Sequence, residues 1–445
     1  MKFIPIFFYV IVLSTSKYLE LDMNIIQRPK SSLIKIVNLK SSEEIEVILN
    51  RKSHLFTVNL SIGSNQEELT VIIDTGSTIL WLPSSKCYKC SKQMKKFEES
   101  LSFTYKNLTT PFSISYADGS STKGFISQEK LQFGSTTIQL QFLLSYEIKN
   151  EIDGTSGILG LGIDYYGEES ASIIKMLLAN NQISKQIFSQ KFGKENGKMF
   201  IGDYAPEIIN NFDNFTNCSL PKIAPYSHAM WSCYITHFFT GYNYMFNKTI
   251  AIKNISVLFD SGTNFIIMDT SIEKLFVKSF FREYFKKNYC YKQEEYFLCN
   301  TILHKLHFPP IYFIINEITY RIDGKDLFYN HYSYTQLRII FSNVGGEGTW
   351  ILGQPFLQNY HVVYDMDAKM IGFHGGQRFN ATDYRDYEAE PEESGIPVIN
   401  FIVISFIVLI FAVLIIFKIK SMRDNRIAQI SNNRNVNNVV EPLIN

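Results

Sequence analysis

Two short segments of this chain end in the same pattern, and each supplies one aspartate. An apolar run ends at Asp74 in residues 71–77, and a second ends at Asp260 in residues 257–263. A hydroxyl residue, a glycine and a second hydroxyl residue follow each aspartate: Thr75, Gly76 and Ser77 in the first segment, and Ser261, Gly262 and Thr263 in the second. The two aspartates lie 186 residues apart, which indicates an internal duplication that brings two carboxylates face to face. Such a pair can activate a water molecule without a metal ion, a cofactor or a nucleophilic side chain.

Each residue type in this pattern has a physical reason to be there. The apolar run predicts a buried strand that leaves the aspartate in a dry setting at its end. The glycine permits the tight turn that follows, and the hydroxyl of Thr75 or Ser261 can hold the opposite loop by a hydrogen bond. Two carboxylates that lie so close cannot both ionise, so they share a proton. The ionised one is then a general base on water, while the protonated one donates to a substrate carbonyl.

The elements around these segments are expected to be strands. Residues 57–63 alternate between apolar and polar side chains, and residues 68–73 form a second run of this kind. Similar short runs, bounded by Gly, Asn and Ser, continue to about residue 206 and again from 215 to 373. A helix is expected around residues 171–180. The fold class predicted from these patterns is all-β with few short helices.

The chain resembles the pepsin family of aspartic proteases over roughly residues 55–373, because further motifs follow the aspartates in the family's order. Trp81 stands seven residues after Asp74, and residues 114–120 resemble the flap hairpin, with Tyr116, Gly119 and Ser120 as flap and substrate-binding residues. Residues 153–162 and 350–365 resemble the apolar-glycine elements behind the two aspartates, and residues 371–373 match the closing strand. The resemblance implies that Tyr116 closes over the substrate and bonds toward the Trp81 indole.

This resemblance implies a bilobal fold and a peptide hydrolase. The amino-terminal lobe is expected at residues 53–207 and the carboxy-terminal lobe at residues 208–378. Asp74 and Asp260 are the expected catalytic pair, supported by the hydroxyl and glycine residues that follow them. The partners are protein or peptide substrates, with apolar residues flanking the scissile bond, and the enzyme is expected to act as a monomer at acidic pH. Family members divide the roles of base and acid between the two aspartates in the manner described above.

A different class of function stays open. The chain could be a catalytically silent, pepsin-like ectodomain that acts as a binding protein or receptor. Such derivatives usually lose an aspartate or a motif glycine, whereas this chain retains both aspartates and both motif glycines. The active endopeptidase is therefore the favoured hypothesis.

Both ends of the chain carry patterns typical of membrane targeting. Residues 1–16 read as a secretory signal peptide, and residues 17–52 as a pro-segment that could include the first strand of the mature enzyme. Residues 379–395 form an acidic stalk, and the apolar residues 396–417 would span about 33 Å as a helix, enough for one bilayer crossing. Lysines and arginines follow at once in residues 418–445, which predicts a cytosolic tail and a type I orientation in the secretory pathway. The lysosome, the vacuole and the cell surface remain alternatives.

The chain has six cysteines, which in a secreted protein favour disulfides. Six cysteines allow many pairings, and closeness in sequence favours Cys87–Cys90, Cys218–Cys233 and Cys290–Cys299. The first pair could instead be redox-active, but no thioredoxin-like pattern surrounds it. Potential N-glycosylation sites occur at Asn59, Asn107, Asn214, Asn217, Asn247, Asn254 and Asn380.

Composition argues against other classes of function. The 43 Lys and Arg balance 42 Asp and Glu in 445 residues, which gives no basic surplus for nucleic acid. His304 and His307 have no apparent third ligand, so no metal site is expected. The aromatic cluster of Trp231, Tyr234, Phe238, Phe239, Tyr242 and Tyr244 is interpreted as lobe core rather than a carbohydrate platform.

Overall fold

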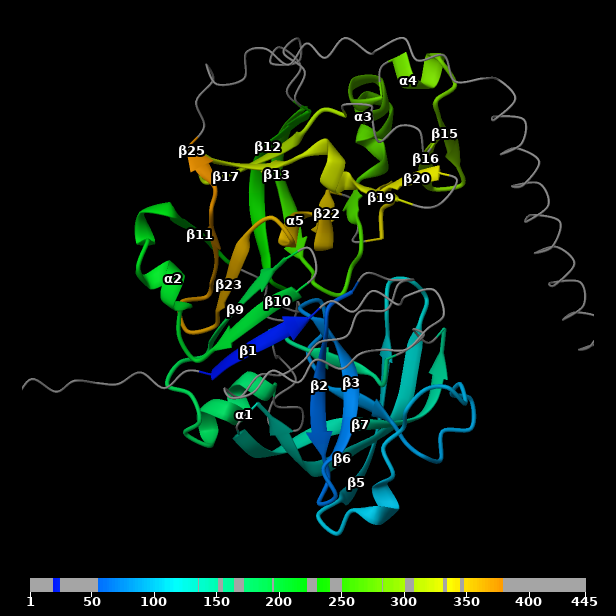
Figure 1. Ribbon diagram of the computed structural model, residues 1–445, viewed down its shortest axis with the longest axis vertical. Helices are drawn as coiled ribbons and strands as arrows, with labels where there is room; N and C mark the ends of the chain where they lie inside the picture. The colour runs from blue at the N-terminus through cyan, green and yellow to red at the C-terminus, as the bar shows by residue number, and fades with distance from the viewer. Residues whose placement is uncertain are drawn as a thin grey trace, which may run out of the picture. The chain divides into compact units, whose positions relative to one another are not determined.

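The structure is a computed structural model that describes residues 19–24, 55–134, 136–150, 155–163, 172–193, 196–221, 230–240, 250–281, 283–300, 308–330, 334–344 and 348–378 (Figure 1). These residues are mostly β-strand with a few short helices, as the sequence predicts. Among them, no helix is both long and apolar enough to cross a membrane. The predicted signal peptide, stalk, membrane span and cytosolic tail lie outside the described residues.

One sheet contains the strand that leads to Asp74. Its seven strands are, in spatial order, β2 (Thr57–Ile62), β3 (Glu67–Asp74), β8 (Ile158–Gly160), β4 (Trp81–Pro83), β7 (Thr136–Lys149), β6 (Ser121–Phe133) and β5 (Lys106–Ser115). The last four residues of β3, which include Asp74, are all buried, because strands on both sides and apolar neighbours exclude water there.

A second sheet contains the strand that leads to Asp260. Its eight strands are β21 (Ile339–Phe341), β14 (Ile266–Met268), β22 (Thr349–Leu352), β13 (Ile250–Phe259), β12 (Ser232–Thr240), β17 (Ile311–Ile315), β18 (Ile318–Ile322) and β25 (Gln377–Arg378). A smaller sheet comprises β15 (Cys290–Gln293), β16 (Tyr296–Asn300), β20 (Tyr334–Leu337) and β19 (Phe328–Asn330).

The two large sheets repeat one local topology around the two aspartates. In the first sheet, β3 pairs in parallel with β8, β8 pairs antiparallel with β4, and β4 pairs in parallel with β7. In the second, β13 pairs in parallel with β22, β22 antiparallel with β14, and β14 in parallel with β21. This repetition agrees with the internal duplication inferred from the two motifs.

A six-stranded sheet draws its strands from both halves of the chain. Its order is β1 (Leu19–Asn24), β10 (Asn196–Ile201), β9 (Ile187–Phe192), β23 (His361–Asp365), β24 (Met370–His374) and β11 (Phe215–Ser219). The edge strand β1 lies beside β10 (Figure 1), and the two pair antiparallel along the whole of β1. Since β1 falls in the predicted pro-segment, part of that segment forms a strand of this sheet.

The helices are short. They are α1 (Ile173–Ala179), α2 (Pro206–Ile209), α3 (Glu273–Phe280), α4 (Glu283–Lys286) and α5 (Gln354–Leu357), with 3-10 turns η1 (Glu99–Leu101), η3 (Phe212–Asn214), η5 (Thr270–Ile272) and η7 (Gly324–Leu327). Helix α1 lies where the sequence predicts a helix. It begins after Ser172, whose side chain accepts a hydrogen bond from the Lys175 backbone amide as an N-cap.

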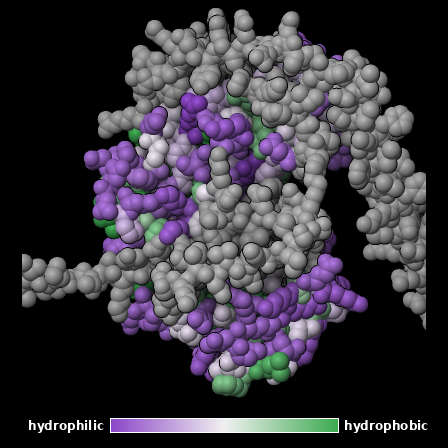
Figure 2. Space-filling model, viewed as in Figure 1, coloured by the Kyte–Doolittle hydropathy of each residue, from purple (hydrophilic) through white to green (hydrophobic). Residues whose placement is uncertain are grey.

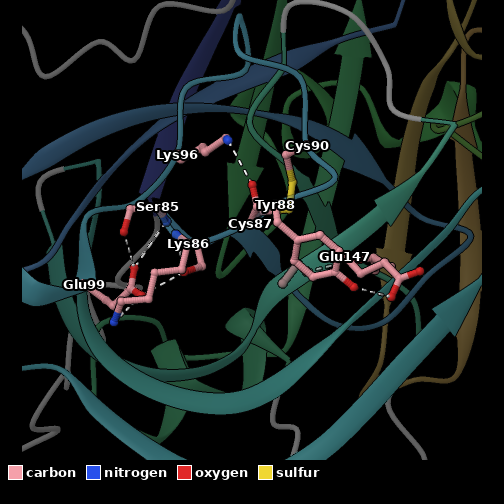
Figure 3. Close-up of a disulfide and its surroundings, with 11 residues drawn as sticks. Ser85, Lys86, Cys87, Tyr88, Cys90, Lys96, Glu99 and Glu147 are labelled. Atoms are coloured by element: carbon pink, nitrogen blue, oxygen red, sulfur yellow. Dashed lines mark hydrogen bonds and ion pairs between the residues drawn. A yellow bond between two sulfur atoms is a disulfide. The ribbon is translucent and has the colours of Figure 1, made fainter. Parts of the chain in front are cut away.

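Three disulfides join the cysteines that are neighbours in sequence: Cys87–Cys90, Cys218–Cys233 and Cys290–Cys299. Figure 3 shows the first one with its surroundings. The Lys96 amine donates to the Cys87 carbonyl at 3.1 Å, and the Tyr88 hydroxyl donates to Glu147 at 3.3 Å. The contact with Glu147 holds the small disulfide loop against strand β7.

The apolar side chains are sorted between the interior and the surface largely as expected. On the face in Figure 2 the described surface is mainly hydrophilic, with separate small hydrophobic patches. Trp231 and Phe238 from the aromatic cluster are fully buried, as a core position requires. Tyr234 was expected in the core, and this expectation is wrong: it is 49% exposed, because alternate residues of strand β12 face opposite sides. Tyr242 and Tyr244 lie outside the described residues.

A buried histidine lies within the six-stranded sheet. The Nδ1 atom of His361 is 2.6 Å from an Oε1 atom of Glu207, and its Nε2 atom is 2.9 Å from the Ser189 hydroxyl. Lys191 pairs with the same glutamate, and His374 is opposite His361 on β24. Burial lowers the pKa of His361 to about 4, although Glu207 acts in the opposite direction. The pKa of Glu207 is also lowered, because hydrogen bonds from Lys191 and His361 outweigh the effect of burial.

We predict that His361 makes the fold less stable in acid. Its pKa is about 4 in the folded protein and about 6.5 when unfolded, so the unfolded chain binds the proton first and stability is lost as the pH falls between these values. Replacing His361 with Gln should reduce the loss of unfolding free energy between pH 7 and pH 4 by roughly 3 kcal/mol. Urea titrations at both pH values measure this. The exposed His237→Gln serves as control, and an equal loss in His361→Gln and wild type contradicts the prediction.

Candidate active site

The two aspartates lie at equivalent places, one at the carboxyl end of β3 and one directly after β13. Asp74 is 5% exposed and Asp260 is half-buried. The backbone amide of Gly76 donates to Asp74 Oδ1 at 2.8 Å, and the Ser77 hydroxyl donates to Oδ2 at 2.5 Å. The Asp74 carboxylate thus has one backbone donor and one side-chain donor, and Asp260 is bound in the same way.

The matching contacts of Asp260 come from its own loop. The Gly262 amide donates to Oδ1 at 2.8 Å, and the Thr263 hydroxyl donates to Oδ2 at 2.6 Å. All the supporting residues expected from the sequence therefore contact their aspartates or the opposite loop. The sequence motif alone explains this symmetry, because the same residue types recur at the same spacing.

Reciprocal hydrogen bonds join the two loops. The Thr75 amide donates to the Ser261 hydroxyl at 3.1 Å, and the Ser261 amide donates to the Thr75 hydroxyl at 2.9 Å. Each hydroxyl also donates onward: Thr75 to the carbonyl of Phe259 at 2.8 Å, and Ser261 to that of Ile73 at 2.9 Å. Both side chains are buried, so these bonds are shielded from competing water.

The two glycines permit this close approach. A Cβ atom on Gly76 would lie 2.9 Å from the carboxyl carbon of Asp260, and one on Gly262 would lie 2.5 Å from Asp74 Oδ1. Each glycine therefore rests against the aspartate of the other loop. The carboxyls from the two halves of the chain meet in one site, as the spacing of the motifs predicts.

The environment of Asp74 favours its protonated form. Burial raises the pKa of Asp74 well above its ordinary value, and the charge of Asp260 raises it further, while the bonds from Ser77 and Gly76 act in the opposite direction. Two carboxyls that interact so strongly titrate as a pair. The arrangement therefore holds a proton between them over a wider pH range than a single exposed carboxyl would.

Further strands fix the aspartate loops from behind. The Leu161 amide, just after β8, donates to the Asp74 carbonyl at 2.7 Å. On the other side the Asp260 amide donates to the Leu352 carbonyl at 3.2 Å, at the end of β22. These are the apolar-glycine segments that the sequence singled out behind each aspartate, and residues 153 and 154 of the first one lie outside the described residues.

A hairpin between β5 and β6 carries Tyr116 toward the site. The Trp81 indole donates to the Tyr116 hydroxyl at 2.8 Å, which is the contact that the sequence resemblance implied. The hairpin turn is closed by bonds from the Tyr116 amide to the Ser120 carbonyl and from the Gly119 amide to the Tyr116 carbonyl. Burial and the nearby Asp74 charge raise the pKa of Tyr116, so it stays a neutral donor.

Sequence reasoning missed two residues that hold the site together. The side-chain amide of the buried Gln354 donates to the Ser261 carbonyl at 2.8 Å. The Trp231 indole, assigned only to the core, donates to the Leu161 carbonyl at 2.8 Å and so links the two halves of the chain. Gln354 lies within the segment 350–365 that the sequence singled out, directly after Gly353, so its position was the available signal. Within the described part of the chain, no group of three or more His, Cys, Asp or Glu side chains could hold a metal ion.

The family model for eukaryotic aspartyl proteases matches residues 55–375. The chain belongs to this family. The match includes both aspartate loops, the flap hairpin and the two supporting segments. Membership in a family of aspartic endopeptidases agrees with the paired carboxyls described above.

Curated relatives agree with the family over most of the chain. Yapsin-3, an aspartic proteinase of Saccharomyces cerevisiae, is 24% identical over 353 residues, which cover 74% of this chain and 67% of the relative. Vacuolar protease A of Aspergillus fumigatus is 26% identical over 340 residues, which cover 70% of this chain and 77% of the relative. Cathepsin E of Cavia porcellus is 26% identical over 353 residues, which cover 74% of this chain and 82% of the relative.

We predict that the Ser261 hydroxyl stabilises the junction of the loops. Ser261→Ala leaves the buried Thr75 amide and Ile73 carbonyl without this partner, so the free energy of unfolding should fall by about 1–3 kcal/mol. Ser261→Thr keeps the hydroxyl and is the matched control, with a smaller expected loss. Denaturant titrations of the three proteins measure the difference, and wild-type stability in Ser261→Ala would show that the bonds contribute nothing.

Proposed function

We propose that this protein is a membrane-anchored aspartic endopeptidase that hydrolyses peptide bonds with a water molecule held between Asp74 and Asp260. The observation that carries the proposal is the mirrored geometry of the two carboxyls. Each is bound by a backbone amide and a hydroxyl, and each is in contact with the glycine of the other loop. A site made only for stability would gain little from two carboxyls buried against one another.

The chemistry follows from a pair that holds a single proton. The ionised carboxyl removes a proton from the water as the water attacks the peptide carbonyl carbon, and the protonated carboxyl donates to the carbonyl oxygen. The tetrahedral intermediate then breaks at its carbon–nitrogen bond: the carboxyl that now carries the proton donates it to the leaving amine, and the other carboxyl takes back a proton from one of the two hydroxyls on the carbon. The pair ends the cycle with one proton, as it began.

The flap gives a reason why the reaction would be shielded from bulk water. Tyr116 is anchored by Trp81 and lies close enough to Asp74 to feel its charge. A peptide bound in an extended form under this hairpin would displace water, which strengthens the electrostatic effects of the two carboxyls.

The membrane anchor rests on sequence. Residues 396–417 are apolar and are followed by Lys418, Lys420, Arg423 and Arg426. This order favours a single span with the protease on the lumenal or outer side. We therefore propose a type I protein of the secretory pathway, made with a signal peptide and a pro-segment.

We predict that Asp74→Asn and Asp260→Asn each abolish peptide cleavage. Either change removes an acid or a base that the other carboxyl cannot replace, so kcat should fall by about 100- to 10,000-fold. The measurement is hydrolysis of a peptide library by the purified full-length proteins, with the exposed Asp213→Asn as control. Wild-type rates in either active-site variant reject the proposal.

We predict a bell-shaped dependence of kcat/KM on pH with its maximum in acid. Because burial and Asp260 raise the pKa of Asp74 above 3.8, the singly protonated pair persists to a higher pH than an isolated aspartate would. Activity should fall on the alkaline side as that proton is lost, and on the acid side as the second carboxyl becomes protonated. A maximum well above neutrality would contradict this assignment of the pair.

A further inference from the structure

A small pocket borders the flap on the side of β7 and β8. Its apolar side is formed by Trp81, Ile148 and Ile158. Tyr116 also lines it, so the pocket adjoins the site of Asp74. The pocket has a volume of only about 20 Å³, so a substrate side chain from a peptide under the flap would meet these apolar groups at its mouth.

The polar side of the same pocket contains one cationic residue, Lys149. It is the last residue of β7 and is paired in register with Ser121 on the flap hairpin. The next residue, Asn150, donates from its side chain to the Gly119 carbonyl at 3.4 Å. Lys149 is thus held at the rim of the pocket, next to the flap that covers the substrate.

The charge of Lys149 is not neutralised within the described part of the chain, where it makes no ion pair. Glu147, two residues earlier on β7, is already bound by Lys89 at 2.5 Å and by Tyr88 (Figure 3). Asp118 at the tip of the hairpin accepts a hydrogen bond from the Ser120 amide at 2.8 Å, inside its own turn. Glu147 and Asp118 are therefore engaged by other donors, and Glu151 and Asp153, which follow Lys149 in sequence, lie outside the described residues.

We propose that Lys149 makes this protease select substrates with an acidic side chain at the residue that reaches the mouth of this pocket. The inference rests on the proposed function and names a substrate class for it. The methylene groups of a glutamate would pack against the apolar side, and its carboxylate would reach the lysine at the rim. Lys149 is exposed, so the pair should contribute about as much as other exposed ion pairs do.

The experiment compares matched peptides that differ only by Glu or Gln, at each position in turn on both sides of the scissile bond. With the full-length protein at about pH 5.5, where a glutamate is ionised, one position should show a kcat/KM about two- to fivefold higher for Glu, as an exposed ion pair allows. Lys149→Met should bring this ratio close to one, and Lys149→Glu should invert it. Lys130→Met, on an exposed part of β6 away from the pocket, is the control and should keep the wild-type ratio.

The outcomes separate the two proposals. If Lys149→Met and wild type cleave the peptides with the same ratio of kcat/KM for Glu to that for Gln, the proposed role of Lys149 is wrong. The proposal that the protein is a protease is then unaffected. If the wild type cleaves none of the peptides, both proposals fail. A further readout is pH: the preference of the wild type should shrink below about pH 4, as the substrate carboxylate becomes protonated.

Discussion

The loops that carry Asp74 and Asp260 approach one another so closely that only glycine fits at the point of contact. Any larger side chain at Gly76 or Gly262 would occupy the space of the opposite carboxyl. The reciprocal bonds between Thr75 and Ser261 hold the loops in this position from below. Since two carboxyls in a dry site repel one another when ionised, this contact must be held by the surrounding fold. The pairing of the loops is thus the constraint that the other elements serve.

Three features of the fold meet this constraint. The strands β3 and β13 deliver the aspartates, and their parallel partners β8 and β22 fix the loops by backbone bonds. The six-stranded sheet combines three strands from each half of the chain, and the halves share the hydrogen-bonded ladder between β9 and β23. Trp231 adds a direct bond from one half to a carbonyl in the other. A shift of either half would strain all of these contacts together, so the positions of the two carboxyls are held by the whole fold.

Much of this site could be read from the sequence, because its chemistry is local. The aspartate motifs, the flap hairpin and the contact between Trp81 and Tyr116 depend on short segments with characteristic residues. Apart from the pairing of the two aspartate loops, long-range contacts have no such signal in the sequence. The buried group of His361, Ser189 and Glu207 joins residues far apart in the chain, and nothing in their neighbours indicates the contact. Tyr234 was misassigned because an aromatic cluster on a strand divides between two faces, and composition does not tell which residue faces inward.

The placement of the tryptophans has an optical consequence. The chain has three of them, and each lies in a different part of the described structure. Trp81 contacts the flap tyrosine, Trp231 bridges the halves, and Trp350 is buried against Phe238. Their fluorescence therefore combines three separate reporters. A variant that keeps only the first would register movement of the hairpin over a bound ligand, while one that keeps only the second would register separation of the halves, with no label attached to the protein.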